Sequence, residues 1–137
     1  MSMEFLASTV RVTVHRDGDD LLSAGLGLDG LRGLPSVFAD PLQPDAGELR
    51  RRAIQSSWKG IADFGPLGGF GRVYAAVPDV PGREFSAFAR LPQAHAPFRV
   101  LLQAPDRFDP RARCLLVAPS SGSRGVYGAI ALAGSSP

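Results

Sequence analysis

The chain is poor in the residues that many functional sites require. Its 137 residues include one cysteine, one tryptophan, two histidines and a single lysine, Lys59. One cysteine, Cys114, excludes an internal disulfide and a cysteine-based zinc site. The sequence also has no run of about 18 apolar residues, so no transmembrane helix is predicted.

The net charge is small as well. The formal net charge is +2, which is too small to indicate a nucleic-acid partner or an acidic membrane surface. The hydrophobic fraction of 45% with 20% charged residues is typical of a globular chain. The 16 glycines and 12 prolines predict many turns and loops. The length favours a single domain spanning residues 1–137.

Signatures of nucleophilic catalysis and of metal or cofactor binding are missing. No G-x-S-x-G is present, so there is no nucleophile elbow and no catalytic residue is assigned. His15 alternates with valines and is predicted on the solvent face of a strand, whereas His95 lies in a proline-flanked connection. Neither histidine has metal-type spacing to carboxylates, so no metal site is predicted. Four aspartates are interpreted as caps and turn formers: Asp19, Asp20, Asp106 and Asp109.

A literal G-x-G-x-x-G runs from Gly25 to Gly30. A dinucleotide fingerprint needs a strand directly before it and a helix directly after it. Here a predicted short helix, capped by Asp19 or Asp20 and continuing to Leu26, precedes the match, and a loop expected over residues 27–44 follows it. A glycine turn at a helix end is therefore favoured, and no cofactor is predicted.

The amino-terminal half predicts one strand and one long helix. Alternation over Val10–His15 indicates a half-buried strand. Asp45 and Glu48 have capping-box spacing at the start of a helix over Asp45–Asp63. Its apolar stripe is predicted to contain Leu49, Ala53, Trp58 and Ile61. The basic residues of this helix are interpreted as a solvated face, with an anionic partner as the alternative: Arg50, Arg51, Arg52 and Lys59.

The second half predicts strands followed by a helix. A short strand is expected over Arg72–Val77, and strands over Glu84–Leu91 and Pro97–Gln103 are joined by a connection of hairpin length. The apolar run Cys114–Ala118 predicts a strand covered on both faces, next to Pro97–Gln103 and with the thiol packed inside. Small residues over Arg124–Gly134 indicate the first turns of a helix.

A Ser/Gly-rich turn between the last strand and that helix is the one candidate catalytic element. Ser120, Ser121, Gly122 and Ser123 offer backbone N–H groups at a helix N-terminus, where they could stabilise an oxyanion. Arg124 could contact an anion there. The alternative is an ordinary strand-to-helix turn.

Five motifs resemble, in family order, the amino-terminal part of the 3-hydroxybutyrate oligomer hydrolases. They are Asp19–Gly27, Phe38–Pro44, Glu48–Ile54, Gly68–Tyr74 and Ala118–Ile130. The resemblance implies an α/β-hydrolase-type serine esterase that cleaves oligomers of D-3-hydroxybutyrate to monomer in polyhydroxybutyrate degradation. Family members are several times longer, and their catalytic serine, histidine and acid lie beyond this chain.

The expected fold is therefore α/β: amino-terminal helices plus the first strands of a truncated hydrolase-like sheet. Residues 1–64 are expected to be mainly helix and loop, and residues 72–137 to form early strands and the start of a helix. The expected partner of the intact enzyme is a small-molecule ester. The alternative is an inactive remnant or a small interaction module.

Two further expectations concern location and assembly. The family is commonly exported, which predicts an extracellular or periplasmic enzyme. The start of this chain lacks the basic and apolar parts of a signal peptide, so as written it is expected in the cytoplasm. An open sheet edge predicts self-association.

Overall fold

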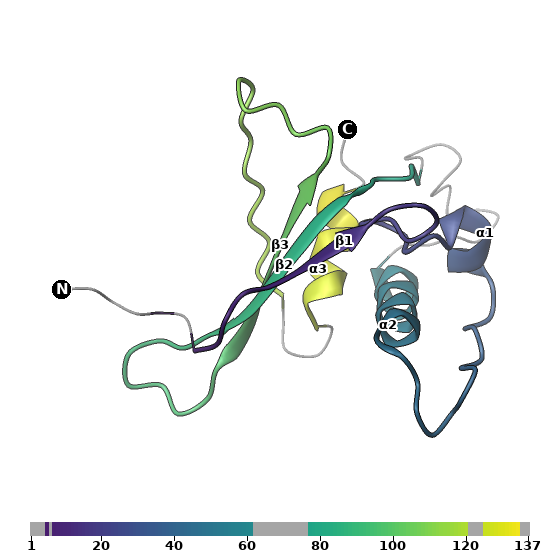
Figure 1. Ribbon diagram of the computed structural model, residues 1–137, viewed down its shortest axis with the longest axis horizontal. Coiled ribbons are helices and arrows are strands. Elements are labelled where there is room, and N and C mark those ends of the chain that lie inside the picture. The colour runs from purple at the N-terminus through teal and green to yellow at the C-terminus, as the bar shows by residue number, and fades with distance from the viewer. Residues whose placement is uncertain (1–4, 6, 62–76, 121–124, 135–137) are drawn as a thin grey trace.

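The computed structural model describes residues 5, 7–61, 77–120 and 125–134, and has a small α/β fold (Figure 1). The order of its elements along those residues is β1 (Arg11–His15), α1 (Gly27–Arg32), α2 (Ala46–Ile61), β2 (Gly82–Ala89), β3 (Phe98–Pro105) and α3 (Gly125–Gly134). The helices predicted near residues 45–63 and 124–134 and the strands near residues 10–15, 84–91 and 97–103 are confirmed. The strand predicted over Arg72–Val77 lies almost entirely outside the described residues.

The three strands form one antiparallel sheet in the order β1-β2-β3. β2 and β3 are a hairpin in which Gly82 pairs with Pro105 and Ala89 with Phe98. β1 reaches the sheet from the other end of the chain and pairs His15 with Gly82. The amino-terminal part of the chain therefore supplies an edge strand as well as helices.

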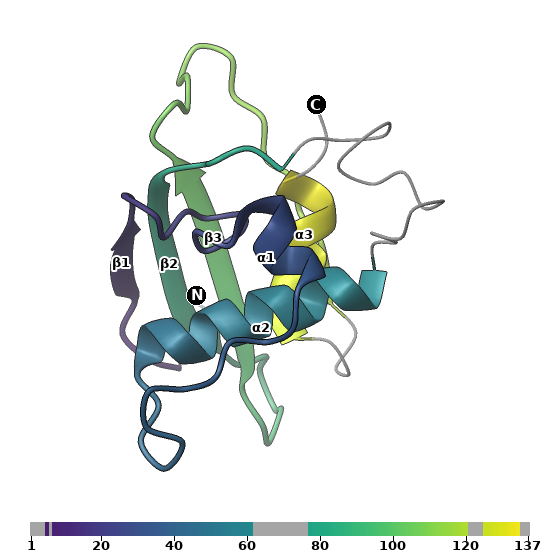
Figure 2. The same cartoon turned by 90° about the vertical axis from the view of Figure 1, so that its right-hand side faces the viewer.

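The described helices lie against one face of the sheet (Figure 2), and no described helix lies on the opposite face (Figure 1). Residues directly opposite one another in an antiparallel pair point to the same side of the sheet. The strand register therefore defines an outer face, turned away from the helices, made of Val12, Val14, Arg83, Phe85, Ala87, Ala89, Phe98, Val100, Leu102 and Ala104.

The buried apolar core lies among the helices and the turn that follows β1. Its residues are Leu22, Ala24, Leu31, Ile54, Trp58 and Tyr127. Trp58 is 1% exposed, and its indole N–H donates to the carbonyl oxygen of Leu22 at 3.0 Å. This hydrogen bond gives the indole N–H a partner, which it would otherwise lack once the ring is buried.

The long helix α2 begins as its sequence predicts. The Glu48 amide donates to Asp45 Oδ1 at 2.8 Å, and the Asp45 amide donates to Glu48 Oε2 at 3.0 Å. This reciprocal pair satisfies two amides of the first turn. The predicted stripe is wrong in detail, since Leu49 is 50% exposed whereas Ile54 is buried.

The segment between β1 and α2 differs from expectation. Residues 21–25 form a turn instead of a helix, and α1 lies where a loop was predicted. The turn forms because the buried Asp20 carboxylate accepts backbone N–H groups, and because Ala24 and Gly25 adopt positive φ. A Cβ at Gly25 would overlap the Gly18 carbonyl oxygen, so only glycine fits there.

The strand predicted over Cys114–Ala118 is not present. These residues have no regular structure, the Cys114 thiol is exposed, and Leu115 and Val117 are 77% and 76% exposed. An apolar run becomes a buried strand only where neighbouring strands and layers cover it. None does so among the described residues, and the hydrolase-like sheet is not confirmed.

We expect the core to depend on Ile54 far more than on Leu49 of the same helix. Ile54→Ala should lower the free energy of unfolding by about 2–5 kcal/mol, because it removes buried methyl groups and leaves a cavity. Leu49→Ala should change it by less than about 0.5 kcal/mol. Urea unfolding followed by the fluorescence of Trp58 measures both, and equal effects would contradict the described core.

Candidate functional site

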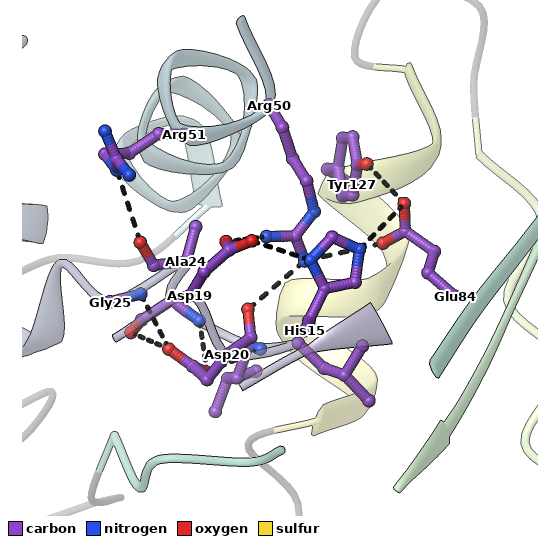
Figure 3. Close-up of polar contacts among 12 residues, drawn as sticks. His15, Asp19, Asp20, Ala24, Gly25, Arg50, Arg51, Glu84 and Tyr127 are labelled. Atoms are coloured by element: carbon purple, nitrogen blue, oxygen red, sulfur yellow. Dashed lines mark hydrogen bonds and ion pairs between the residues drawn. The ribbon is translucent and has the colours of Figure 1, made fainter. Parts of the chain in front are cut away.

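A buried polar cluster ties the helices to the sheet (Figure 3). Its side chains come from β1, the turn after β1, α2, β2 and α3, in the order His15, Asp19, Arg50, Glu84 and Tyr127. Four of these five residues are less than 10% exposed. The cluster therefore joins segments that are far apart in the chain within a water-poor environment.

Arg50 is the centre of this cluster. Its Nη1 donates to Asp19 Oδ1 at 2.7 Å, and its Nη2 donates to the Asp20 carbonyl oxygen at 3.2 Å and to Glu84 Oε2 at 3.5 Å. The guanidinium also lies 5.8 Å from the centroid of the Tyr127 ring. The prediction of a fully solvated basic helix face is therefore wrong for Arg50, whose charge is matched by carboxylates from the turn and from β2.

His15 is also buried, contrary to the sequence-based expectation. It is 3% exposed, whereas Val12 and Val14 are 52% and 53% exposed. Its Nδ1 lies 2.8 Å from Asp19 Oδ2, and its Nε2 lies 4.0 Å from Glu84 Oε1. Alternation predicted the strand but not which face is covered, and the helices here cover the polar face.

Glu84 receives donors from three elements. Tyr127 Oη donates to Glu84 Oε1 at 2.8 Å, and Gln103 Nε2 donates to Glu84 Oε2 at 3.1 Å. Burial, together with the neighbouring Glu84 carboxylate that accepts this hydrogen bond, raises the pKa of Tyr127 to about 12. Both effects favour the neutral phenol over a buried phenolate.

Asp20 organises the adjoining turn. Its Oδ1 accepts the amides of Leu22 and Ser23 at 2.7 and 2.8 Å, and its Oδ2 accepts the Ser23 hydroxyl and the Gly25 amide at 2.6 and 2.8 Å. Burial alone would raise the pKa of Asp20, but these hydrogen bonds to the carboxylate outweigh it and lower the pKa. The predicted role of Asp20 as a turn former is confirmed, whereas its predicted role as the cap of a helix over residues 21–26 is wrong, because residues 21–25 form a turn.

The cluster has the composition of a structural ion network. The neighbours of the His15 ring are carboxylates, and His95 is exposed in the connection between β2 and β3. His15 Nε2 and Arg50 Nε have no hydrogen-bond partner within the described part of the chain. A nucleophile activated by a general base needs a hydrogen bond between the two. The His15 Nδ1 contact with Asp19 is compatible with a catalytic histidine, but Nε2, which would take a proton from a nucleophile, faces Glu84 and has no hydroxyl or thiol bonded to it among the described residues.

The loop predicted to supply oxyanion donors is described at only one residue. Ser120 is exposed, and its hydroxyl donates to the Gly125 carbonyl oxygen at the start of α3. Ser121, Gly122, Ser123 and Arg124 lie outside the described residues. The proposed donor role of this loop stays a prediction.

An open apolar groove lies beside α2, away from the buried cluster. It has a volume of about 460 Å³ and is lined by Leu34, Pro35, Val37, Phe38, Pro41 and Arg52. The Arg52 guanidinium lies 4.8 Å from the Phe38 ring centroid and donates to the Ser36 carbonyl oxygen at 2.8 Å. The basic residue of this groove is therefore engaged with its own loop.

Two searches of the described residues gave negative results. Within them, no group of three or more His, Cys, Asp or Glu side chains is placed to hold a metal ion. Among the described helices, none has both the length and the apolar character needed to cross a membrane.

Comparison with known proteins identifies the family. The family model described as 3HB-oligomer hydrolase matches residues 3–136. This chain belongs to the 3HB-oligomer hydrolase family. The match spans all three strands, all three helices and the buried cluster, and it confirms the resemblance seen in the sequence motifs.

Individual 3HB-oligomer hydrolases show the same relationship. The chain is 41% identical to the D-(-)-3-hydroxybutyrate oligomer hydrolase of Burkholderia ambifaria over 143 residues, and 42% identical to those of Burkholderia vietnamiensis and Burkholderia thailandensis over 144 residues. Each comparison covers 95% of this chain and 20% of the relative. The chain thus spans about a fifth of the length of these curated relatives. No solved structure matches.

Sequence reasoning missed Arg50 and Glu84 as cluster residues. Arg50 belongs to a run of three arginines, which is typical of a solvated helix face. Glu84 lies in a predicted strand with no motif around it. Nothing in the linear spacing of 31 residues between Asp19 and Arg50 identifies that pair.

We expect the Asp20 carboxylate to make the free energy of unfolding depend on pH in the acidic range. Its folded pKa is lower than its unfolded pKa, so its contribution is complete above about pH 5 and is lost as the pH falls through the folded pKa. Asp20→Asn should cost about 1–3 kcal/mol at neutral pH, because amides of the turn lose their acceptor. Urea unfolding at a series of pH values, with exposed Asp17→Asn as the control, tests this; identical pH profiles for both variants would contradict it.

Tyr127 gives the complementary prediction at high pH. Because its folded pKa is raised to about 12, its contribution is complete below the unfolded value near pH 10 and declines as the pH rises toward 12. Absorbance titration of tyrosinate should show a step with a pKa of about 12 that disappears in Tyr127→Phe. A step near 10 assigned to Tyr127 would show that its hydroxyl is not held by Glu84.

Proposed function

We propose that this chain contributes a structural module to an enzyme that hydrolyses oligomers of D-3-hydroxybutyrate. The observation that carries the proposal is the family match over residues 3–136, together with relatives named D-(-)-3-hydroxybutyrate oligomer hydrolase. The reaction adds water across the ester bond between two hydroxybutyrate units, and so releases a carboxylate and an alcohol.

The proposal assigns the chemistry to a serine-esterase mechanism in the intact enzyme. There a serine attacks the ester carbonyl, a histidine transfers the proton, and backbone N–H groups hold the oxyanion. This chain has no G-x-S-x-G, and the buried His15 is held between carboxylates. Its part in catalysis is therefore to build the scaffold, with the Ser120–Ser123 loop as the candidate for oxyanion donors. Export of the enzyme from the cytoplasm remains part of this proposal.

A second candidate is an interaction module without catalytic activity. It is favoured by the exposed apolar side chains of the sheet and of residues 115–117. The two candidates differ in one measurable respect, which is whether the chain supports ester hydrolysis when it is joined to the remainder of a family enzyme.

We expect the 137-residue chain alone to release no D-3-hydroxybutyrate from the dimer or trimer. A chimera in which it replaces the matching segment of the Burkholderia ambifaria hydrolase should be active, and the same enzyme without that segment should be inactive. Enzymatic assay of the released monomer measures all three. Turnover by the chain alone that disappears in Ser121→Ala or Ser123→Ala would place the nucleophile in the loop, and a folded but inactive chimera would favour the interaction module.

A further inference from the structure

The outer face of the sheet is apolar, and no described helix or strand packs on it. The small side chains of Ala87 and Ala89 on this face are buried, whereas the large apolar side chains around them are exposed. Val12, Val14, Phe98, Val100 and Leu102 are 40% to 53% exposed. Within the three strands, Arg83 is the one charged residue on this face. A surface of contiguous large apolar residues is unusual on a self-contained protein and marks a place where something packs.

The segment that follows β3 also exposes apolar side chains. Residues 106–120 arch away from the sheet on the side opposite the helices (Figure 1). Within that segment Phe108, Leu115, Leu116 and Val117 are 52% to 77% exposed. Domains are normally built from packed layers, and a sheet with helices on one face and apolar side chains on the other lacks its second covering layer.

We propose that the outer face packs against the part of the 3HB-oligomer hydrolase polypeptide that this chain does not span. The inference rests on the proposed function. Its basis is that the relatives match 95% of this chain but are about five times as long, so the same sheet there is accompanied by much additional polypeptide. The occupant is therefore a covalently linked, predominantly apolar layer of the hydrolase.

A second copy of this chain is the less suitable occupant. Stacking two identical outer faces would bring two Arg83 side chains onto a face that carries no acidic residue in its strands. Asp106, which interacts with Arg83 at the end of β3, already accepts two hydrogen bonds from Arg16 at 2.8 and 2.9 Å. Like charges brought together in an apolar interface are unfavourable.

Thiol labelling tests the proposal without relying on activity. Cys114→Ser removes the natural thiol, and Val100→Cys or Val12→Cys then places one on the outer face. Leu49→Cys is the matched control, because Leu49 is 50% exposed on α2. Each variant is made both in the 137-residue chain and in the Burkholderia ambifaria chimera, and labelling rates are followed by peptide mass spectrometry.

Covering of the outer face should slow labelling of Val100→Cys and Val12→Cys at least roughly tenfold in the chimera relative to the chain alone, whereas Leu49→Cys changes little. Equal rates in chimera and chain would overturn the proposal. Protection in the chain alone that grows with concentration, with a dimer by light scattering, would overturn it in favour of a second copy. Hydrolysis by the chimera is measured separately. An active chimera with fast labelling would contradict only the proposed covering of the outer face. A protected but inactive chimera would contradict only the proposed function.

Discussion

The contact between Arg50 and Glu84 is the constraint on which the arrangement of the layers depends. It joins α2 to β2 across 34 residues of sequence, and both side chains are almost completely buried. A buried ion pair of this kind is not evidence of high stability, because the desolvation of both charges offsets much of their attraction. An Arg50 buried without these carboxylates would leave an unpaired charge in the interior, which is strongly unfavourable. The observed packing of α2 on the sheet pairs Arg50 with both Asp19 and Glu84.

The other buried polar groups complete that arrangement. Asp19 shares its two oxygens between Arg50 and His15, and Tyr127 brings α3 to the opposite side of Glu84. Asp20 closes the turn from which Leu22 enters the apolar core beside Trp58. The polar cluster and the core are thus neighbouring parts of one interior. The inner face of the sheet thus carries buried polar groups with partners from the helices, whereas the outer face carries exposed large apolar side chains.

This asymmetry relates the structure to the family. One face of the sheet has a helical layer, buried charges and hydrogen-bonded turns, and the other has exposed valines, leucine and phenylalanine. Membership of the 3HB-oligomer hydrolase family, with relatives about five times as long, gives a physical reason for such a face.

The sequence by itself determined the elements whose signals are local. The capping box at Asp45 and Glu48, the alternation up to His15, the hairpin of β2 and β3 and the small residues of α3 each depend on neighbours within a few positions, and the motifs together identified the family. Only the tertiary structure decided which faces are covered. Val12 and His15 exchange their expected environments, Arg50 is buried, and the apolar run from Cys114 is exposed, because burial depends on segments far away in the chain. Apolar periodicity shows that the two faces of a strand differ, but which face meets another layer depends on contacts with distant segments, such as the one between Arg50 and Glu84.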